Sequence, residues 1–130
     1  MRYLGIDYGD KRVGLALSDE EGILGMPYKT IENKNLIKAL KKIIKEEGIG
    51  FVVLGLPLNL KMEKTAQTKK VTDFMACFKK HIKIPISLEN EFLTSVQAKN
   101  SGAEGENIDS SSAAIILQSY LDTQKYKNAK

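Results

Sequence analysis

Residues 3–19 read YLGIDYGDKRVGLALSD, two apolar runs separated by Gly9-Asp10-Lys11. A short turn containing Gly between two such runs is typical of a β-hairpin. Asp7 lies inside the first run, although strand interiors select against Asp. Because a buried carboxylate without a partner is costly, it is usually neutralised, ion-paired or bound to a metal. The segment therefore predicts a hairpin that carries a functional acid, with pairing to Lys11 or Arg12 as the structural alternative.

The rest of the chain alternates helix and strand patterns. Residues 35–47 repeat apolar side chains at helical spacing and stop at Gly48, and residues 51–54 form a continuous apolar run that suits a central buried strand. The predicted strands are 2–8, 12–18, 23–31, 51–54 and 84–88, and the predicted helices are 35–47, 64–81, 94–100 and 109–122. Three strands followed by alternating helices and strands predict an α/β domain with a mixed sheet.

Length and composition favour a single small domain over residues 1–130, with 123–130 as a polar tail. One cysteine excludes an intrachain disulfide and fits a reducing compartment. No apolar run approaches the roughly 20 residues that span a membrane, and the first strand begins too early for a signal peptide. We therefore expect a cytoplasmic protein. Its net charge of +4 is compatible with a polyanionic partner.

Three carboxylates stand where strands end and helices begin. Asp7 is in the first strand, Glu91 follows the last strand and Asp109 opens the last helix. Functional residues of open α/β sheets gather at this edge, and acids brought together there need a cation or a raised pKa. Oxygen ligands favour Mg²⁺ or Mn²⁺, whereas one His and one Cys cannot supply a usual zinc site. Two such ions, held roughly 4 Å apart, can hydrolyse a phosphodiester.

Each of these residues also has a structural reading. Asp109 precedes three serines and an apolar run, as an ordinary N-cap does, and Glu91 alone fits a solvated loop acid. His81, at a helix end, fits a side chain that caps carbonyl groups. The segment from Gly55 to Asn59 lacks the glycine spacing and the Lys-Ser/Thr of a P-loop, although Asn59 could contact a phosphate or the metal shell.

With these residues in place, the chain resembles the YqgF family of Holliday-junction-resolvase-like proteins. The resemblance runs nearly end to end and has its most specific motifs at the two ends. The matching segments are GIDYGDKRVGLALSD at 5–19, GLPLN at 55–59, LTS at 93–95 and DSSSAAIILQSYLD at 109–122. The resemblance implies an RNase H-like fold, with a mixed five-stranded sheet whose first three strands are antiparallel, flanked by helices.

The resemblance also implies residue roles. Asp7 would be the first-strand acid, Glu91 rather than Glu89 the second acid, and Asp109 the acid at the start of the last helix. The family is regarded as a metal-dependent nuclease acting on the 5′ end of precursor 16S ribosomal RNA. An older assignment made it a Holliday junction resolvase.

This chain departs from the family pattern at two places. Asn90-Glu91-Phe92 replaces the usual Asp-Glu-Arg, and residues 60–67 lack the usual glycines and arginine. These differences remove guanidinium groups that would make bidentate contacts to phosphate, which affects substrate placement more than metal binding. Lys61, Lys64 and the lysines at 69–70 could act as point charges instead.

We therefore predict a hydrolase, a nuclease of structured nucleic acid. Its substrate would be precursor ribosomal RNA or a ribosomal particle. The predicted catalytic and metal-binding residues are Asp7, Glu91 and Asp109, with two Mg²⁺ or Mn²⁺ ions, and the predicted nucleic-acid-binding residues are Lys11, Arg12, Asn59, Lys61 and Lys64. The alternatives are junction resolution, which needs a homodimer rather than a monomer, and a non-catalytic protein that binds RNA or the ribosome.

Overall fold

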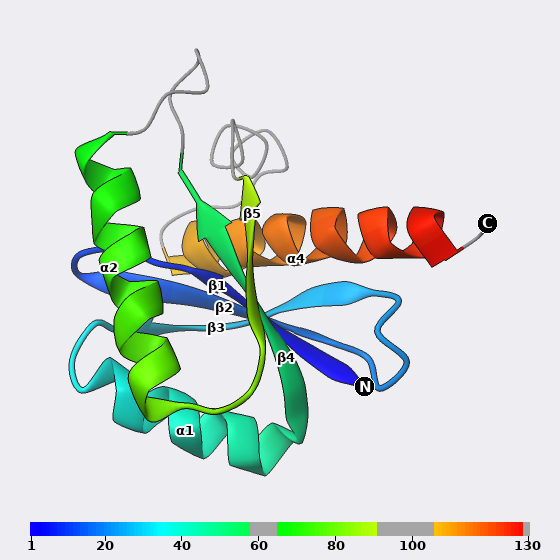
Figure 1. Cartoon of the computed structure of the whole chain (residues 1–130), viewed down its shortest axis with the longest axis horizontal. Helices are drawn as coiled ribbons and strands as arrows, with labels where there is room; N and C mark the ends of the chain where they lie inside the picture. The colour runs from blue at the N-terminus through cyan, green and yellow to red at the C-terminus, as the bar shows by residue number, and fades with distance from the viewer. Residues whose placement is uncertain (58–64, 91–105, 129–130) are drawn as a thin grey trace.

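The computed structural model describes residues 1–57, 65–90 and 106–128, which form five strands and three helices (Figure 1). In chain order they are β1 (Arg2–Asp7), β2 (Arg12–Ser18), β3 (Gly25–Glu32), α1 (Leu36–Glu47), β4 (Ile49–Leu56), α2 (Ala66–His81), β5 (Ile86–Asn90) and α4 (Glu106–Asn128). Within the described ranges, no helix is both long enough and apolar enough to cross a membrane.

The strands form one mixed sheet in the order β3-β2-β1-β4-β5. β1 pairs antiparallel with β2, and β2 pairs antiparallel with β3, whereas β1, β4 and β5 run parallel. The register places Ile6 of β1 beside Leu54 of β4. The predicted mixed sheet with three antiparallel strands is confirmed, and β1 is its central strand.

Helices cover both faces of the sheet (Figure 1). Alternate residues of β1 point to opposite faces, so Leu4 and Ile6 join the core beneath α1 and α2. Gly5 lies on the other face, under α4. A Cβ atom at Gly5 would lie 2.8 Å from the Cβ of Leu117 and 2.9 Å from the Ala113 carbonyl oxygen. The absence of a side chain at Gly5 therefore lets α4 pack directly on β1.

Several predicted boundaries differ from the structure. α4 begins at Glu106 instead of residue 109 and continues to Asn128, so residues 123–128 are helical and are not a tail outside the helix. This segment contains no Gly or Pro to stop the helix. β5 spans Ile86–Asn90 instead of 84–88, and β4 is longer than the predicted apolar run. The predicted helix at 94–100 lies outside the described residues.

Candidate active site

Asp7 is the last residue of β1, and its neighbour across the hairpin is Gly14 of β2. Its side chain is half-buried, so it lies at the carboxyl end of the central strand and not in the strand interior that the sequence suggested. Strand alternation puts Asp7 on the same face as Gly5, the face that α4 covers. The carboxyl ends of strands are where α/β sheets bind ligands, so this position suits a functional acid.

The direction of α4 brings its first turns toward Asp7. Ala113 packs on Gly5, while Gln118 hydrogen-bonds to the backbone of Ile23 and Gly25 near the opposite end of β1. α4 therefore runs antiparallel to β1. The backbone of Asp109, one turn before Ala113, belongs to the end of the helix nearer to Asp7. The role of Asp109 stays a prediction.

The second predicted acid, Glu91, lies outside the described residues, as do Asn59, Lys61 and Lys64. β5 ends at Asn90, and it runs parallel to β4 and β1, so its carboxyl end is at the same edge of the sheet as Asp7. Glu89 accepts a hydrogen bond of 2.6 Å from the Ser119 hydroxyl of α4. Beside it, burial raises the pKa of Tyr120.

Lys11 lies in the turn that follows Asp7 and Arg12 is the first residue of β2, and both are exposed. A Cβ atom at Gly9 would lie 2.5 Å from the Arg12 carbonyl oxygen, so the tight turn requires glycine. The Asn33 side-chain amide donates to the Gly9 carbonyl over 2.7 Å, and the Asn33 backbone N–H donates to the Lys11 carbonyl over 2.9 Å. The β3–α1 connection thus fixes the backbone of the turn, including that of Lys11, at the edge where β1 ends.

The described residues include one oxygen donor that the sequence did not single out. The Ser112 side chain is 1% exposed, and its Oγ has no hydrogen-bond partner within the part of the chain that the structure describes. It lies three residues after Asp109 on α4, a spacing that puts two residues on neighbouring positions of one helix face. The sequence does not predict the burial of Ser112, because it is one of three consecutive serines that follow an aspartate. A hydroxyl oxygen is a ligand type that suits a hard cation such as Mg²⁺.

The described side chains do not complete a metal site by themselves. Among them, no group of three His, Cys, Asp or Glu side chains is close enough to hold an ion. The predicted set is divided between Asp7, the undescribed Glu91 and the first turn of α4. His81 is outside this region: its Nδ1 is 2.9 Å from the Cys77 carbonyl oxygen, as the predicted capping role requires.

Comparison with known proteins agrees with this architecture. A protein of Maridesulfovibrio salexigens is 39% identical, with 93% of this chain and 98% of the relative aligned, and one of Thermoanaerobacter pseudethanolicus is 37% identical, with 98% and 100% aligned. The names of both relatives propose a nuclease acting on pre-16S rRNA.

Two solved structures share the fold at low sequence identity. The RuvC protein of T. thermophilus, in complex with a Holliday junction, matches with a TM-score of 0.62 at 11% identity over 97% of this chain and 96% of that one. The Fowlpox virus resolvase, in complex with Holliday junction DNA, matches with a TM-score of 0.60 at 12% identity over 95% and 99%. The fold is therefore RNase H-like, as predicted.

The family model that matches this chain covers residues 1–123 and is described as RuvX, Holliday junction resolvase. This is the YqgF family that the sequence motifs resemble, and the two near-full-length relatives agree with it. The chain belongs to the RuvX family of nuclease-like proteins with an RNase H-like fold.

Proposed function

We propose that this protein is a divalent-metal-dependent nuclease that hydrolyses phosphodiester bonds in the 5′-end maturation of precursor 16S rRNA. The observation that carries the proposal is the position of Asp7 at the carboxyl end of the central strand, on the face covered by α4. The names of the near-full-length relatives support ribosomal RNA as the substrate.

Asp7, Glu91 and Asp109 would hold Mg²⁺ or Mn²⁺ ions, with Ser112 as a further oxygen donor. When bound, such ions activate water and offset the charge that develops on the leaving oxygen. Lys11 is in the turn after Asp7 and Arg12 begins β2, so they would offset phosphate charge beside the cleaved bond. Asn59, Lys61 and Lys64 keep their predicted role as further contacts to the nucleic acid backbone.

The test is cleavage of a precursor 16S 5′-leader RNA with Mg²⁺ or Mn²⁺ by the wild type, Asp7→Asn and Asp122→Asn. Asp122 is an exposed acid near the other end of α4, so its substitution makes the same chemical change away from the site. We expect Asp7→Asn to lower the cleavage rate by on the order of 10²–10³-fold or more, as loss of a main electrostatic contact does. Unchanged cleavage by Asp7→Asn would contradict the proposal.

Junction resolution is the second candidate, because the matching family model and the Fowlpox virus neighbour are described as resolvases, and the RuvC neighbour is in complex with a Holliday junction substrate. A four-way DNA junction in the same assay tests it. Symmetric cutting of two strands requires two active sites, so the cutting species would be a homodimer by solution mass. If the protein binds RNA but cuts neither the RNA that contains the leader sequence nor RNA that lacks it, a non-catalytic binding protein is favoured.

A further inference from the structure

We propose that the molecule carries a second nucleic-acid-binding surface on the α1 side of the sheet edge, for the phosphodiester backbone of RNA flanking the cleaved bond. This inference rests on the proposed nuclease function and extends it. We call this surface the basic track, and its cations are Lys11, Arg12, Lys34, Lys38, Lys41 and Lys70.

Three adjoining hollows make the basic track continuous. The first, of about 420 Å³, extends from the β1–β2 turn to Lys34, and the second, of about 440 Å³, lies between α1 and α2. These two share Asp10 and Asn33 in their linings. The third, of about 400 Å³, shares Leu36 and Ile37 with the second and lies on the exposed side of α1. A strand of nucleic acid could therefore follow the surface without interruption.

The linings of the three hollows hold six cations and three acids, and the acids are Asp10, Asp73 and the exposed Glu32. Two of these acids form ion pairs: Asp10 with Lys70 at 2.8 Å, and Asp73 with a lysine one residue before Lys70 at 3.1 Å. Lys34 and the two α1 lysines of the track form no ion pair within the described ranges. The first turn of α1 holds no acidic residue.

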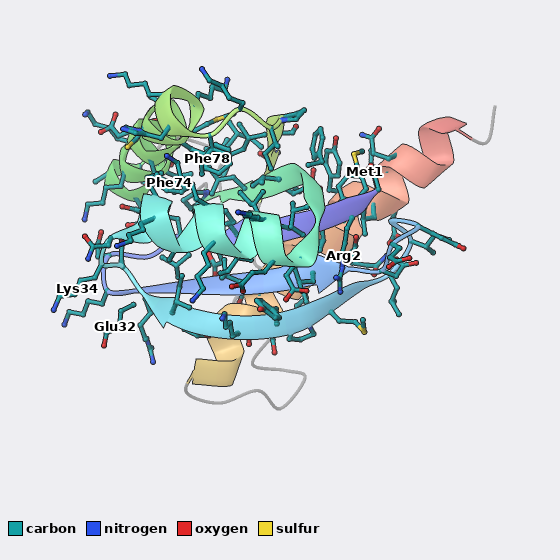
Figure 2. The ribbon with its side chains drawn as sticks, turned by 90° about the horizontal axis from the view of Figure 1, so that it is seen from below. Met1, Arg2, Glu32, Lys34, Phe74 and Phe78 are labelled. Atoms are coloured by element: carbon teal, nitrogen blue, oxygen red, sulfur yellow. The ribbon has the colours of Figure 1, made fainter. Side chains whose placement is uncertain are left out.

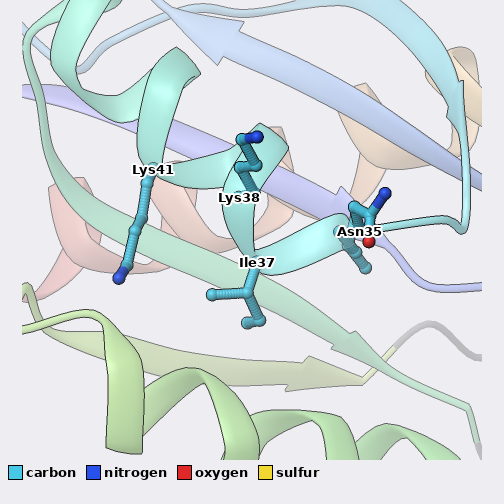
Figure 3. Close-up of a pocket in the computed structure, with 5 residues that line it drawn as sticks. Asn35, Ile37, Lys38 and Lys41 are labelled. Atoms are coloured by element: carbon cyan, nitrogen blue, oxygen red, sulfur yellow. The ribbon is translucent and has the colours of Figure 1, made fainter.

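The side chains of α1 present these charges outward. Figure 3 shows Lys38 and Lys41 extending from α1, with Lys38 pointing up and Lys41 pointing down in the view and Ile37 below Lys38. Figure 2 shows Lys34 at the end of the molecule opposite Met1, which is the end that contains the β1–β2 turn. Exposed lysines are flexible point charges, so they suit contacts to phosphates that do not depend on base sequence.

The basic track begins where the candidate active site ends. Asp7 faces α4, while the next residue, Tyr8, lies on the opposite face and stacks on Phe74 with ring centroids 4.7 Å apart. Tyr8 and Phe74 line the middle hollow of the track. A polynucleotide held at Asp7 therefore needs only to cross the β1–β2 turn, past Lys11, to reach α1.

The test compares two charge-matched triple variants, each in an Asp7→Asn background so that binding is measured without cleavage. One carries Lys34→Gln, Lys38→Gln and Lys41→Gln. The control carries the same change at exposed lysines near the carboxyl end of α2, at positions 79, 80 and 83. Affinity for the precursor 16S 5′-leader RNA is measured across a salt series, and circular dichroism verifies the fold.

We expect the track variant to bind RNA at least tenfold more weakly at about 0.15 M salt, and its log–log salt slope to fall by about 2–3, as the loss of three phosphate contacts requires. The control should change much less. Equal losses of RNA affinity in both variants would show that only the net charge of the protein matters. An unchanged RNA affinity in the track variant would show that RNA does not bind the basic track. Either result overturns the proposal. Cleavage by enzyme with an intact Asp7 is scored separately, so failure of the nuclease function is distinguishable.

Discussion

Asp7 and Tyr8 are consecutive residues in different surroundings. The carboxylate lies at a half-exposed edge under α4, whereas the Tyr8 ring is stacked on Phe74 in the opposite layer. Because side chains alternate across a strand, packing at Tyr8 fixes the direction in which Asp7 leaves the backbone. The acid is therefore positioned by the hydrophobic core behind it.

Ser112 is the residue with the most specific stability consequence. An unpaired buried hydroxyl costs roughly 1–3 kcal/mol, and alanine is the better helix former by about 0.5 kcal/mol. We expect Ser112→Ala to raise the free energy of unfolding by about 1 kcal/mol in metal-free buffer while lowering metal-dependent cleavage. Chemical denaturation measures the first effect. Ser111→Ala is the control, because it makes the same change in helix propensity at a neighbouring residue that is less buried.

At that position, destabilisation by more than about 1 kcal/mol in Ser112→Ala would show that the hydroxyl has a protein partner. Unchanged cleavage would leave Ser112 without a role in the site. A gain in stability combined with a loss of activity is the pattern expected of a residue kept for function.

At the scale of elements, the packing of α4 on β1 determines whether the first turn of α4 lies close to Asp7. We expect Gly5→Ala to lower the free energy of unfolding by about 1–3 kcal/mol, because the new methyl group overlaps Leu117 and the Ala113 carbonyl and forces α4 outward. Cleavage should fall further than the unfolded fraction explains, because α4 also carries Asp109. Thermal denaturation and single-turnover cleavage measure the two effects.

Gly50→Ala is the matched control for Gly5→Ala. Gly50 is in β4, and a Cβ atom there would meet the flexible end of the Met1 side chain at 2.8 Å. Met1 can move aside at little cost, so we expect a small change in stability and normal cleavage. An equal effect of both substitutions would mean that α4 packing is not specific to Gly5.

The elements that the sequence predicts well are those with strong local signals. Alternating apolar residues around a glycine turn predicted the β1–β2 hairpin, and Gly48 predicted the end of α1. The start of β5 was predicted two residues early, at Ile84. The Pro85 carbonyl already accepts a hydrogen bond from the Val52 backbone N–H, but β5 itself begins at the next residue, Ile86. The length of α4 was underestimated because polar composition alone does not end a helix.

The candidate site was predictable only in part. Asp7 could be singled out because a carboxylate within an apolar strand is energetically costly unless it has a partner. Glu91 and Asp109 could be singled out by their positions after a strand and at the start of a helix, and the resemblance to a family supplied their roles in the site. Ser112 and the tie between Asn33 and the β1–β2 turn depend on contacts between distant segments, so no local pattern indicates them.

At the scale of the whole molecule, metal binding should be visible in stability before any substrate is added. An ion that binds the folded state at about 100 times its Kd adds about 2.7 kcal/mol to the free energy of unfolding. We expect MgCl₂ or MnCl₂ to raise the Tm of the wild type, and Asp7→Asn to lose most of that rise. Differential scanning calorimetry with NaCl at matched ionic strength measures the effect.

The outcome separates metal binding from general salt effects. Asp122→Asn should keep the metal-dependent rise in Tm, because its carboxylate lies toward the other end of α4. An identical rise in Asp7→Asn and wild type would place the ion elsewhere or nowhere specific, and would remove Asp7 from the metal site even if cleavage were observed.

The packing of α4 on β1 also has a consequence for when the protein becomes active. β1 precedes α4 in the chain order of the described elements, and the face of the sheet at Gly5 stays uncovered until α4 has emerged from the ribosome. Domains fold during synthesis from the amino terminus, so the hairpin and the layer with α1 and α2 can form on the nascent chain. A centre that needs both Asp7 and α4 cannot assemble until α4 has emerged from the ribosome. A nuclease that acts on ribosomal RNA would thus stay inactive on the ribosome that is making it until α4 has emerged.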